Sequence, residues 1–133
     1  MNPTELILKN FEKVSSVPRG SKNEAAIRNW LIEWAAKHNC ASKTDTAGNL
    51  VIYAPASVGY EDRPTLILQG HMDMVCQKTL ESTHDFTKDP IQLIRDGDWI
   101  RANGTTLGAD NGIGIALIMS LVEDESVKHP PLE

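Results

Sequence analysis

Two short segments of the chain carry side chains whose types and spacing suit metal chemistry. The first is His71 and Asp73, two residues apart, directly after the apolar run Thr65–Gln69. If this segment stays extended, both side chains point the same way, so the imidazole can bind a cation while the carboxylate fixes its tautomer. Taken alone, a His-x-Asp pair is more often a hydrogen-bonded loop histidine beside a solvated aspartate, and this alternative stays open.

The second segment is the glycine-rich stretch Gly104–Gly112, which places Asp110 before an apolar helix. Gly108 and Gly112 permit tight backbone geometry that residues with a β-carbon resist. The segment matches neither the phosphate loop G-x-x-x-x-G-K-[ST] nor the dinucleotide pattern G-x-G-x-x-G, and the chain has no G-x-S-x-G nucleophile elbow. A carboxylate here could bridge two cations about 3.5–4 Å apart, as in two-metal hydrolases. An ordinary helix entry is the alternative.

Composition limits the class of protein. A chain of 133 residues with 41% hydrophobic residues suits one globular domain. Its net charge of −5 and scattered basic residues argue against nucleic acid or anionic membrane partners. The longest apolar stretch, Ile113–Val122, is too short to span a bilayer and suits a buried helix. Without a secretory signal, and with Cys40 and Cys76 interpreted as reduced thiols, the expected location is the cytoplasm.

Helix signals are strongest near the N-terminus. Asn2 can cap a helix, with Pro3 at the first helical position and Glu5 completing a capping box. Ser21–Glu24 is interpreted as a second capping box. It precedes a helix with apolar residues at i, i+3, i+4 and i+7 from Ile27.

Short strands are expected between and after these helices. The alternation of the two kinds of element predicts an α/β fold with a mixed sheet. Ligands of open α/β sheets bind beyond the carboxyl ends of strands, which is where His71 lies. The strands are predicted at 42–45, 49–54, 65–70 (of the buried type), 91–95 and 99–102, with an entry to another at 130–133.

Together the motifs closely resemble the aminoacyl-histidine (Xaa-His, or cytosol non-specific) dipeptidases of the M20 metallopeptidase family. The resemblance runs over essentially the whole chain. It implies that His71 binds one metal ion, that Asp110 bridges two, and that Asp73 acts in catalysis by orienting His71. It also implies a cis peptide bond after Asp110. The segments that carry it are Gly70–Val75, His84–Ile91, Gly104–Gly112 and Pro131–Glu133.

The resemblance further implies that residues 1–133 are the N-terminal, incomplete portion of an α/β/α catalytic domain, with the lid domain absent. In the family, two adjacent glutamates, a general base and a metal ligand, follow shortly after the position of Glu133. We therefore expect the isolated chain to be inactive, to bind metal weakly or not at all, and to self-associate through non-native contacts. Zinc is expected first, two ions per complete site, with manganese and cobalt as alternatives.

The function implied for the parent protein is hydrolysis of Xaa-His and other short peptides, with a dipeptide as substrate. The alternatives are another M20-type amidohydrolase or deacylase, and a non-catalytic binding module. The other histidines, His38, His84 and His129, are interpreted as structural or loop residues. Glu123–Glu125 is interpreted as a solvated helix end.

Overall fold

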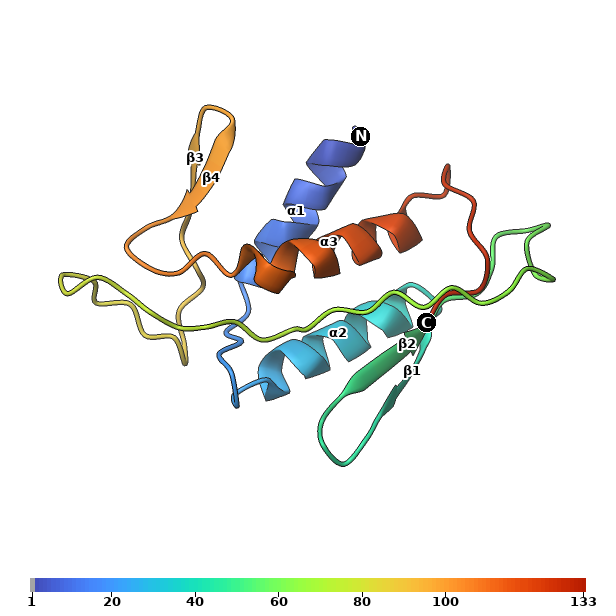
Figure 1. The fold of residues 1–133 in the computed structure, drawn as a ribbon, viewed down its shortest axis with the longest axis horizontal. Helices are drawn as coiled ribbons and strands as arrows, with labels where there is room; N and C mark the ends of the chain where they lie inside the picture. The colour runs from blue at the N-terminus through green and yellow to red at the C-terminus, as the bar shows by residue number, and fades with distance from the viewer. Residues whose placement is uncertain (1) are drawn as a thin grey trace.

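Three helices and two antiparallel hairpins form the regular structure of residues 2–133, which the computed structural model describes (Figure 1). No helix among these residues has the length and apolar character needed to cross a bilayer. The helices are α1 (Pro3–Ser15), α2 (Ala25–Lys37) and α3 (Ala109–Glu123), and the strands are β1 (Ala41–Thr44), β2 (Leu50–Tyr53), β3 (Leu93–Asp96) and β4 (Trp99–Ala102).

The predicted start of α1 is confirmed, whereas the predicted start of the second helix is wrong. Asn2 accepts a hydrogen bond from the backbone of Thr4 at 2.9 Å, and its own N–H donates to Glu5 at 3.3 Å, so the capping box is present. In α2 the N-cap is Glu24, which makes no capping hydrogen bond. The hydroxyl of Ser21 instead donates to the carboxylate of Asp73, 52 positions away in the chain, and is therefore not available to cap α2.

The named strands form two separate antiparallel pairs, and the predicted mixed pairing arises through isolated bridges on both sides of Leu132. Beyond the β1–β2 hairpin, Ala54 pairs antiparallel with Leu132, and Leu66 pairs with the same residue in parallel. Backbone hydrogen bonds of 2.8–3.0 Å join Leu66 and Leu68 to the segment 131–133. The predicted hairpin at 91–102 is also confirmed as β3 and β4.

The segment 65–70 is extended, but the prediction that it is buried is wrong within the described residues. Leu66 is 47% exposed and Ile67 69% exposed, and only Leu68 and Gly70 are half-buried. The physical reason is that side chains alternate along an extended segment, so that Leu68 packs against the core while Ile67 points to the opposite side. Because the segment pairs with the few residues 131–133, it forms an isolated bridge rather than a full strand.

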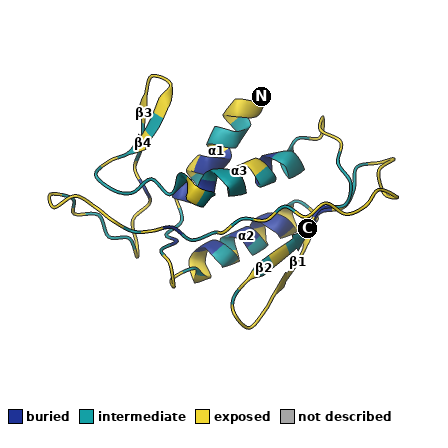
Figure 2. Ribbon diagram, viewed as in Figure 1, coloured by how far each residue is buried: buried dark blue, intermediate teal, exposed yellow. Residues whose placement is uncertain are grey.

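One hydrophobic core joins the three helices to the sheet. Figure 2 shows its buried residues on the facing sides of the helices, whereas the long loops are mostly exposed or half-buried. Leu68 and Met72 pack against this core, so the chain on both sides of Gly70 is anchored to it. Its buried members are Val14, Ile27, Leu31, Trp34, Ala35, Cys40, Ala54, Met119 and Leu132.

Glu123 ends α3 in a half-buried polar cluster, so its interpretation as part of a solvated helix end is wrong. Its side chain is 12% exposed. One carboxylate oxygen accepts a hydrogen bond from Trp34 Nε1 and the other from Asn10 Nδ2, both at 2.8 Å. Lys13 Nζ lies 3.8 Å and His38 Nε2 3.6 Å from the carboxylate. One side chain of α3 thus binds groups from both α1 and α2.

We expect Glu123→Gln to destabilise the fold by about 1–3 kcal/mol, the usual cost of leaving a buried hydrogen-bonding group unsatisfied. In the wild type, Trp34 Nε1 and Asn10 Nδ2 each donate to a carboxylate oxygen of Glu123. The glutamine side chain has only one oxygen, so its NH₂ group must face one of these donors, which then loses its acceptor. Urea unfolding at pH 7 measures the change. Glu125→Gln is the control, because Glu125 is exposed and lies outside this polar cluster, and it should leave stability unchanged.

The same residue makes stability depend on pH. Burial raises the pKa of Glu123, but hydrogen bonds from Trp34 and Asn10 and the charges of Lys13 and His38 outweigh it, so the pKa is lowered. Because the pKa of Glu123 is lower in the folded state, its ionised carboxylate stabilises the fold at any pH above the ordinary pKa of about 4.3. This stabilisation is lost as the pH falls through the folded-state pKa. The stability gap between wild type and Glu123→Gln should shrink below pH 4; a constant gap down to pH 3 contradicts this.

The exposed apolar residues along 65–70 lead us to expect self-association of the isolated chain. Leu66 and Ile67 offer uncovered apolar surface beside an extended backbone, and such edges pair readily with other chains. Light scattering over a range of concentrations measures the association. Ile67→Lys should weaken it, whereas Val58→Lys, at a 91% exposed loop position, should not. A monomer at all concentrations would count against the expectation.

Candidate metal centre

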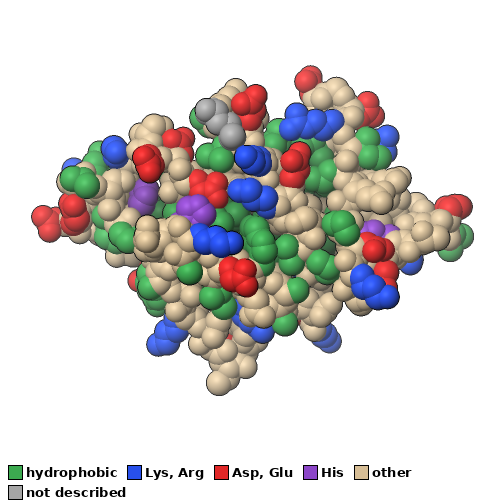
Figure 3. Space-filling model, turned by 180° about the vertical axis from the view of Figure 1, so that it is seen from behind, with side chains coloured by type: hydrophobic (Ala, Val, Ile, Leu, Met, Phe, Trp, Pro, Cys, Tyr) green, Lys and Arg blue, Asp and Glu red, His purple; other side chains and the backbone are tan. Residues whose placement is uncertain are grey.

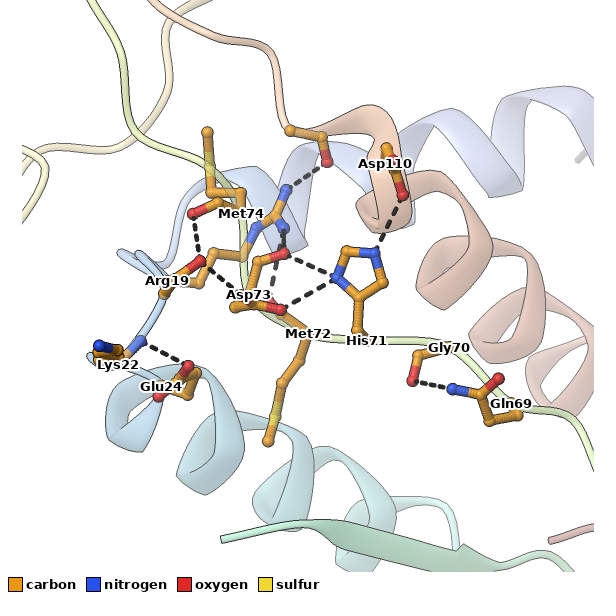
Figure 4. Close-up of polar contacts among 12 residues, drawn as sticks. Arg19, Lys22, Glu24, Gln69, Gly70, His71, Met72, Asp73, Met74 and Asp110 are labelled. Atoms are coloured by element: carbon orange, nitrogen blue, oxygen red, sulfur yellow. Dashed lines mark hydrogen bonds and ion pairs between the residues drawn. The ribbon is translucent and has the colours of Figure 1, made fainter. Parts of the chain in front are cut away.

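The candidate metal centre lies where two anchored segments meet. His71 follows the extended segment 65–70, and Asp110 lies in the first turn of α3, directly after Ala109. Although 39 residues separate them in the chain, His71 Nε2 and Asp110 Oδ1 are 3.0 Å apart (Figure 4). The structure therefore brings together two of the side chains that the sequence singled out.

Both nitrogen atoms of the His71 imidazole face carboxylates. While Nε2 faces Asp110, Nδ1 lies 3.0 Å from Oδ1 of Asp73, the third candidate residue. The hydrogen bond with Asp110 raises the pKa of His71 most, and Asp73 adds to this effect, while partial burial opposes it. The arrangement favours a positive charge on or beside the imidazole.

Asp73 is itself held by a residue that sequence reasoning assigned to another role. The hydroxyl of Ser21 donates to Asp73 Oδ2 at 2.5 Å and has the largest effect in lowering the pKa of Asp73. The hydrogen bond to His71 lowers that pKa further. Nothing in the spacing of Ser21 could indicate this contact, because its capping-box pattern with Glu24 suggested a local role.

The turn around Asp110 has the cis peptide bond that the family resemblance implied, between Asp110 and Asn111. The side chain of Asn111 fills the space between two glycines. A β-carbon on Gly70 would lie 2.5 Å from Asn111 Nδ2, and one on Gly114 would overlap the amide group. A side chain at either glycine would thus displace the Asn111 amide, whose packing brings the segment of His71 next to α3.

The donor set of His71 and Asp110 suits a divalent metal ion. An imidazole nitrogen and a carboxylate oxygen are ordinary zinc ligands, and here they converge on one point. Asp110 is accessible, since its side chain is 96% exposed, and that of His71 is 50% exposed. Within residues 2–133, however, no three His, Cys, Asp or Glu side chains are grouped so that they could hold a metal ion. Further ligands would have to be water or other groups.

The remaining histidines and cysteines lie outside this pair of segments. His38 is the C-cap of α2, with Nδ1 2.8 Å from the carbonyl oxygen of Trp34. His84 lines a separate polar hollow with Asp89 and Asn103. His129 is half-buried rather than exposed, and its Nδ1 lies 2.8 Å from the carbonyl oxygen of Pro130. Both cysteines are free.

The fold of residues 2–133 is shared with part of several solved peptidase structures. The chain superposes with a TM-score of 0.90 on an aminoacylhistidine dipeptidase from Vibrio alginolyticus, at 42% identity, over 95% of this chain and 26% of that one. Two further solved structures share the fold alone. They are a tripeptidase from Staphylococcus aureus (TM-score 0.75, 23% identity) and the aminopeptidase PepT from Bacillus cereus (0.74, 22%), each over 96% of this chain and 34% of theirs.

A curated relative agrees. The chain is 46% identical over 123 residues to the cytosol non-specific dipeptidase of Escherichia coli (strain K12), which covers 92% of this chain. The chain spans about a quarter of the length of that relative, 25%. No protein-family model matches. The chain is thus similar in sequence and fold to about a quarter of each of two dipeptidases, as its motifs predicted.

We expect Gly114→Ala to destabilise the chain by about 1–3 kcal/mol, the usual cost of overpacking. By helix propensity alone the change should stabilise α3 by about 1 kcal/mol. The overlap with Asn111 reverses the sign. Urea unfolding decides between the two outcomes.

A double-mutant cycle isolates the cause. In an Asn111→Ala background the obstruction is gone, so Gly114→Ala should be neutral or stabilising. If Gly114→Ala has the same effect in both backgrounds, the close approach to Asn111 is not what requires a glycine.

Proposed function

We propose that residues 1–133 belong to the catalytic domain of a two-metal dipeptidase that hydrolyses Xaa-His and other short peptides. The observation that carries the proposal is the convergence of His71 and Asp110, with Asp73 behind the imidazole, in a chain more than 40% identical to two dipeptidases. Because those relatives are several times longer than this chain, the activity is proposed for the whole protein.

We further propose that zinc is the metal, with two ions in the complete site and manganese or cobalt as alternatives. His71 Nε2 would bind one ion and the exposed carboxylate of Asp110 would bridge both. When bound, such ions lower the pKa of a water molecule and polarise a peptide carbonyl.

The protein's own residues have positioning roles in this proposal. With a metal ion bound, Asp73 would accept the Nδ1–H of His71 and so leave the Nε2 lone pair free for the ion, in place of the hydrogen bond that Nε2 makes with Asp110. Ser21 donates to the other oxygen of Asp73 and so restricts rotation of that carboxylate. Loss of such supporting hydrogen bonds typically lowers metal affinity about 10–100-fold, and we expect a loss of that size when the hydrogen bond from Ser21 or to Asp73 is removed.

A cytoplasmic location and a dipeptide partner complete the proposal. The E. coli relative is named as a cytosol enzyme. On the face shown in Figure 3, acidic and basic side chains are interspersed rather than gathered in one basic patch, which supports neither a nucleic acid nor an anionic membrane as partner.

Substrate preference tests the proposal. The natural protein that carries this sequence should hydrolyse β-alanyl-histidine and other dipeptides faster than tripeptides or N-acylated amino acids, and a chelator should abolish the activity. Preference for acylated amino acids would favour the deacylase alternative. Tight binding of a dipeptide without any hydrolysis would favour a binding module.

The isolated 133-residue chain, by contrast, should show no meaningful turnover. General-base catalysis contributes about 10²–10⁴-fold, and the family resemblance assigns that role to a glutamate that follows the position of Glu133. The measurement is hydrolysis of a histidine dipeptide by the purified chain. Turnover that is lost both with a chelator and in Asp110→Ala would refute this expectation.

Zinc binding to the isolated chain should be weak, because two protein ligands are fewer than the three or four of ordinary zinc sites. Isothermal titration should show binding no tighter than the micromolar range, lost in His71→Ala and kept in His129→Ala, a histidine outside the site. A submicromolar dissociation constant that His71→Ala abolishes would contradict the expected weak binding.

A further inference from the structure

Arg19 is the largest side chain that the described fold buries almost completely, at 1% exposed. A buried cation normally pairs with a carboxylate, but the hydrogen bonds of Arg19 go to backbone carbonyls. Nη2 donates to Gly108 O at 2.7 Å, and Nη1 lies 3.4 Å from both Met72 O and Asp73 O (Figure 4). Its Nε atom has no partner among the described residues.

These carbonyls belong to the two segments that carry the candidate metal ligands. Met72 and Asp73 directly follow His71, whereas Gly108 lies two residues before Asp110. The guanidinium is therefore bonded on one side to the histidine segment and on the other to the aspartate turn. Thr106 joins the same two stretches of chain farther from the ligands, since its hydroxyl donates to Val75 O at 2.7 Å and its N–H to Gln77 O at 2.8 Å. The bonds of Arg19 lie nearer to both ligands in the sequence.

The backbone of Arg19 is fixed to the histidine segment as well. Arg19 O accepts a hydrogen bond from Met74 N at 2.9 Å, Met74 O accepts one from Ser21 N at 3.1 Å, and Gly20 pairs with Met74 as a parallel bridge. The backbone of Arg19 is thus hydrogen-bonded to the histidine segment, while its guanidinium also contacts the aspartate turn at Gly108.

Two glycines of the Gly104–Gly112 motif leave the space that the guanidinium occupies. A β-carbon on Gly108 or on Gly112 would lie 2.6 Å from Arg19 Nη2. Phe11 of α1 closes the space, since its ring would lie 3.0 Å from the same β-carbon on Gly112. The motif is shaped around a side chain 89 residues away from Gly108.

We infer that Arg19 is a positioning residue that sets the separation between His71 and Asp110 by joining their two backbone segments. The planar guanidinium presents separate nitrogens to separate acceptors, which the single ammonium of lysine cannot do. A buried charge with an unsatisfied Nε is a poor source of stability, and this favours a geometric role. The part of the inference that concerns metal rests on the proposed function.

The test compares Arg19→Lys with Arg28→Lys in the 133-residue chain. Arg28 is a suitable control because its guanidinium also donates to a backbone carbonyl, Gly48 O at 3.3 Å, but this carbonyl belongs to neither ligand segment. Imidazole ¹⁵N spectra report the protonation and hydrogen bonding of each histidine without metal. Zinc titration followed on the same His71 signals reports affinity, and thermal unfolding reports stability.

In Arg19→Lys we expect the His71 nitrogen signals to shift or broaden while those of His38 and His129 stay as in wild type. Zinc affinity at His71 should fall about 10–100-fold, the usual effect of losing a supporting contact. Arg28→Lys should change neither. A purely structural role would lower the unfolding temperature but leave the His71 signals of the folded protein unchanged, and that result would overturn the inference.

A measurement on the wild-type chain covers the case in which Arg19→Lys does not fold. The Nη hydrogens of Arg19 should exchange slowly with solvent, and an NMR coupling across the hydrogen bond should link Nη2 to the carbonyl carbon of Gly108. Fast exchange without that coupling would overturn the inference. If the wild-type chain binds no zinc at His71, the proposed function is what fails, and the metal-free spectra still decide the role of Arg19.

Discussion

The approach of His71 to Asp110 is the contact on which the rest of the site depends, because neither residue is held there by its own local structure. His71 follows an extended segment with few backbone partners, and Asp110 lies in a turn with non-helical φ and ψ angles. The contact is maintained from outside: Leu68 and Met72 pack against the core, and Asn111 fits between Gly70 and Gly114. Precision at the site therefore comes from the packing and hydrogen bonds of the surrounding segments rather than from the ligands themselves.

The relative placement of the three helices depends in a similar way on one group, the carboxylate of Glu123. Glu123 accepts hydrogen bonds from Asn10 of α1 and Trp34 of α2, so the end of α3 is fixed relative to both. Because α3 begins at the Asp110 turn, fixing its far end also restrains its direction. A carboxylate distant from the metal ligands thus contributes to their placement through a rigid helix.

Local signals predicted much of the fold. Asn2 and Glu5 give the α1 cap, the hairpin turn at Asp96–Asp98 gives β3 and β4, and apolar spacing from Ile27 gives α2, because each depends on neighbouring residues. His71, Asp73 and Asp110 were found because their types and glycine-rich surroundings are unusual. These are the parts in which the physics is local.

The contacts that sequence reasoning missed are long-range and made by residues with ordinary alternatives. Ser21 matched a capping box and Glu123 matched a solvated helix end, and both instead find partners more than 50 positions away. Arg19 gave no signal at all, since a lone arginine after a proline is normally a surface residue. Such roles follow only from tertiary geometry.

The bridges on both sides of Leu132 affect the order in which the chain can fold. Leu66 pairs with Leu132, which is synthesised 66 residues later. At a synthesis rate of about 5–20 residues per second, this delay is about 3–13 s. During that time Leu66 and Ile67 lie on an extended segment without its neighbour, and closing so long a loop is slow compared with forming a helix. The nascent chain therefore holds this extended segment without its backbone hydrogen-bonding partner until Pro131–Glu133 has been added.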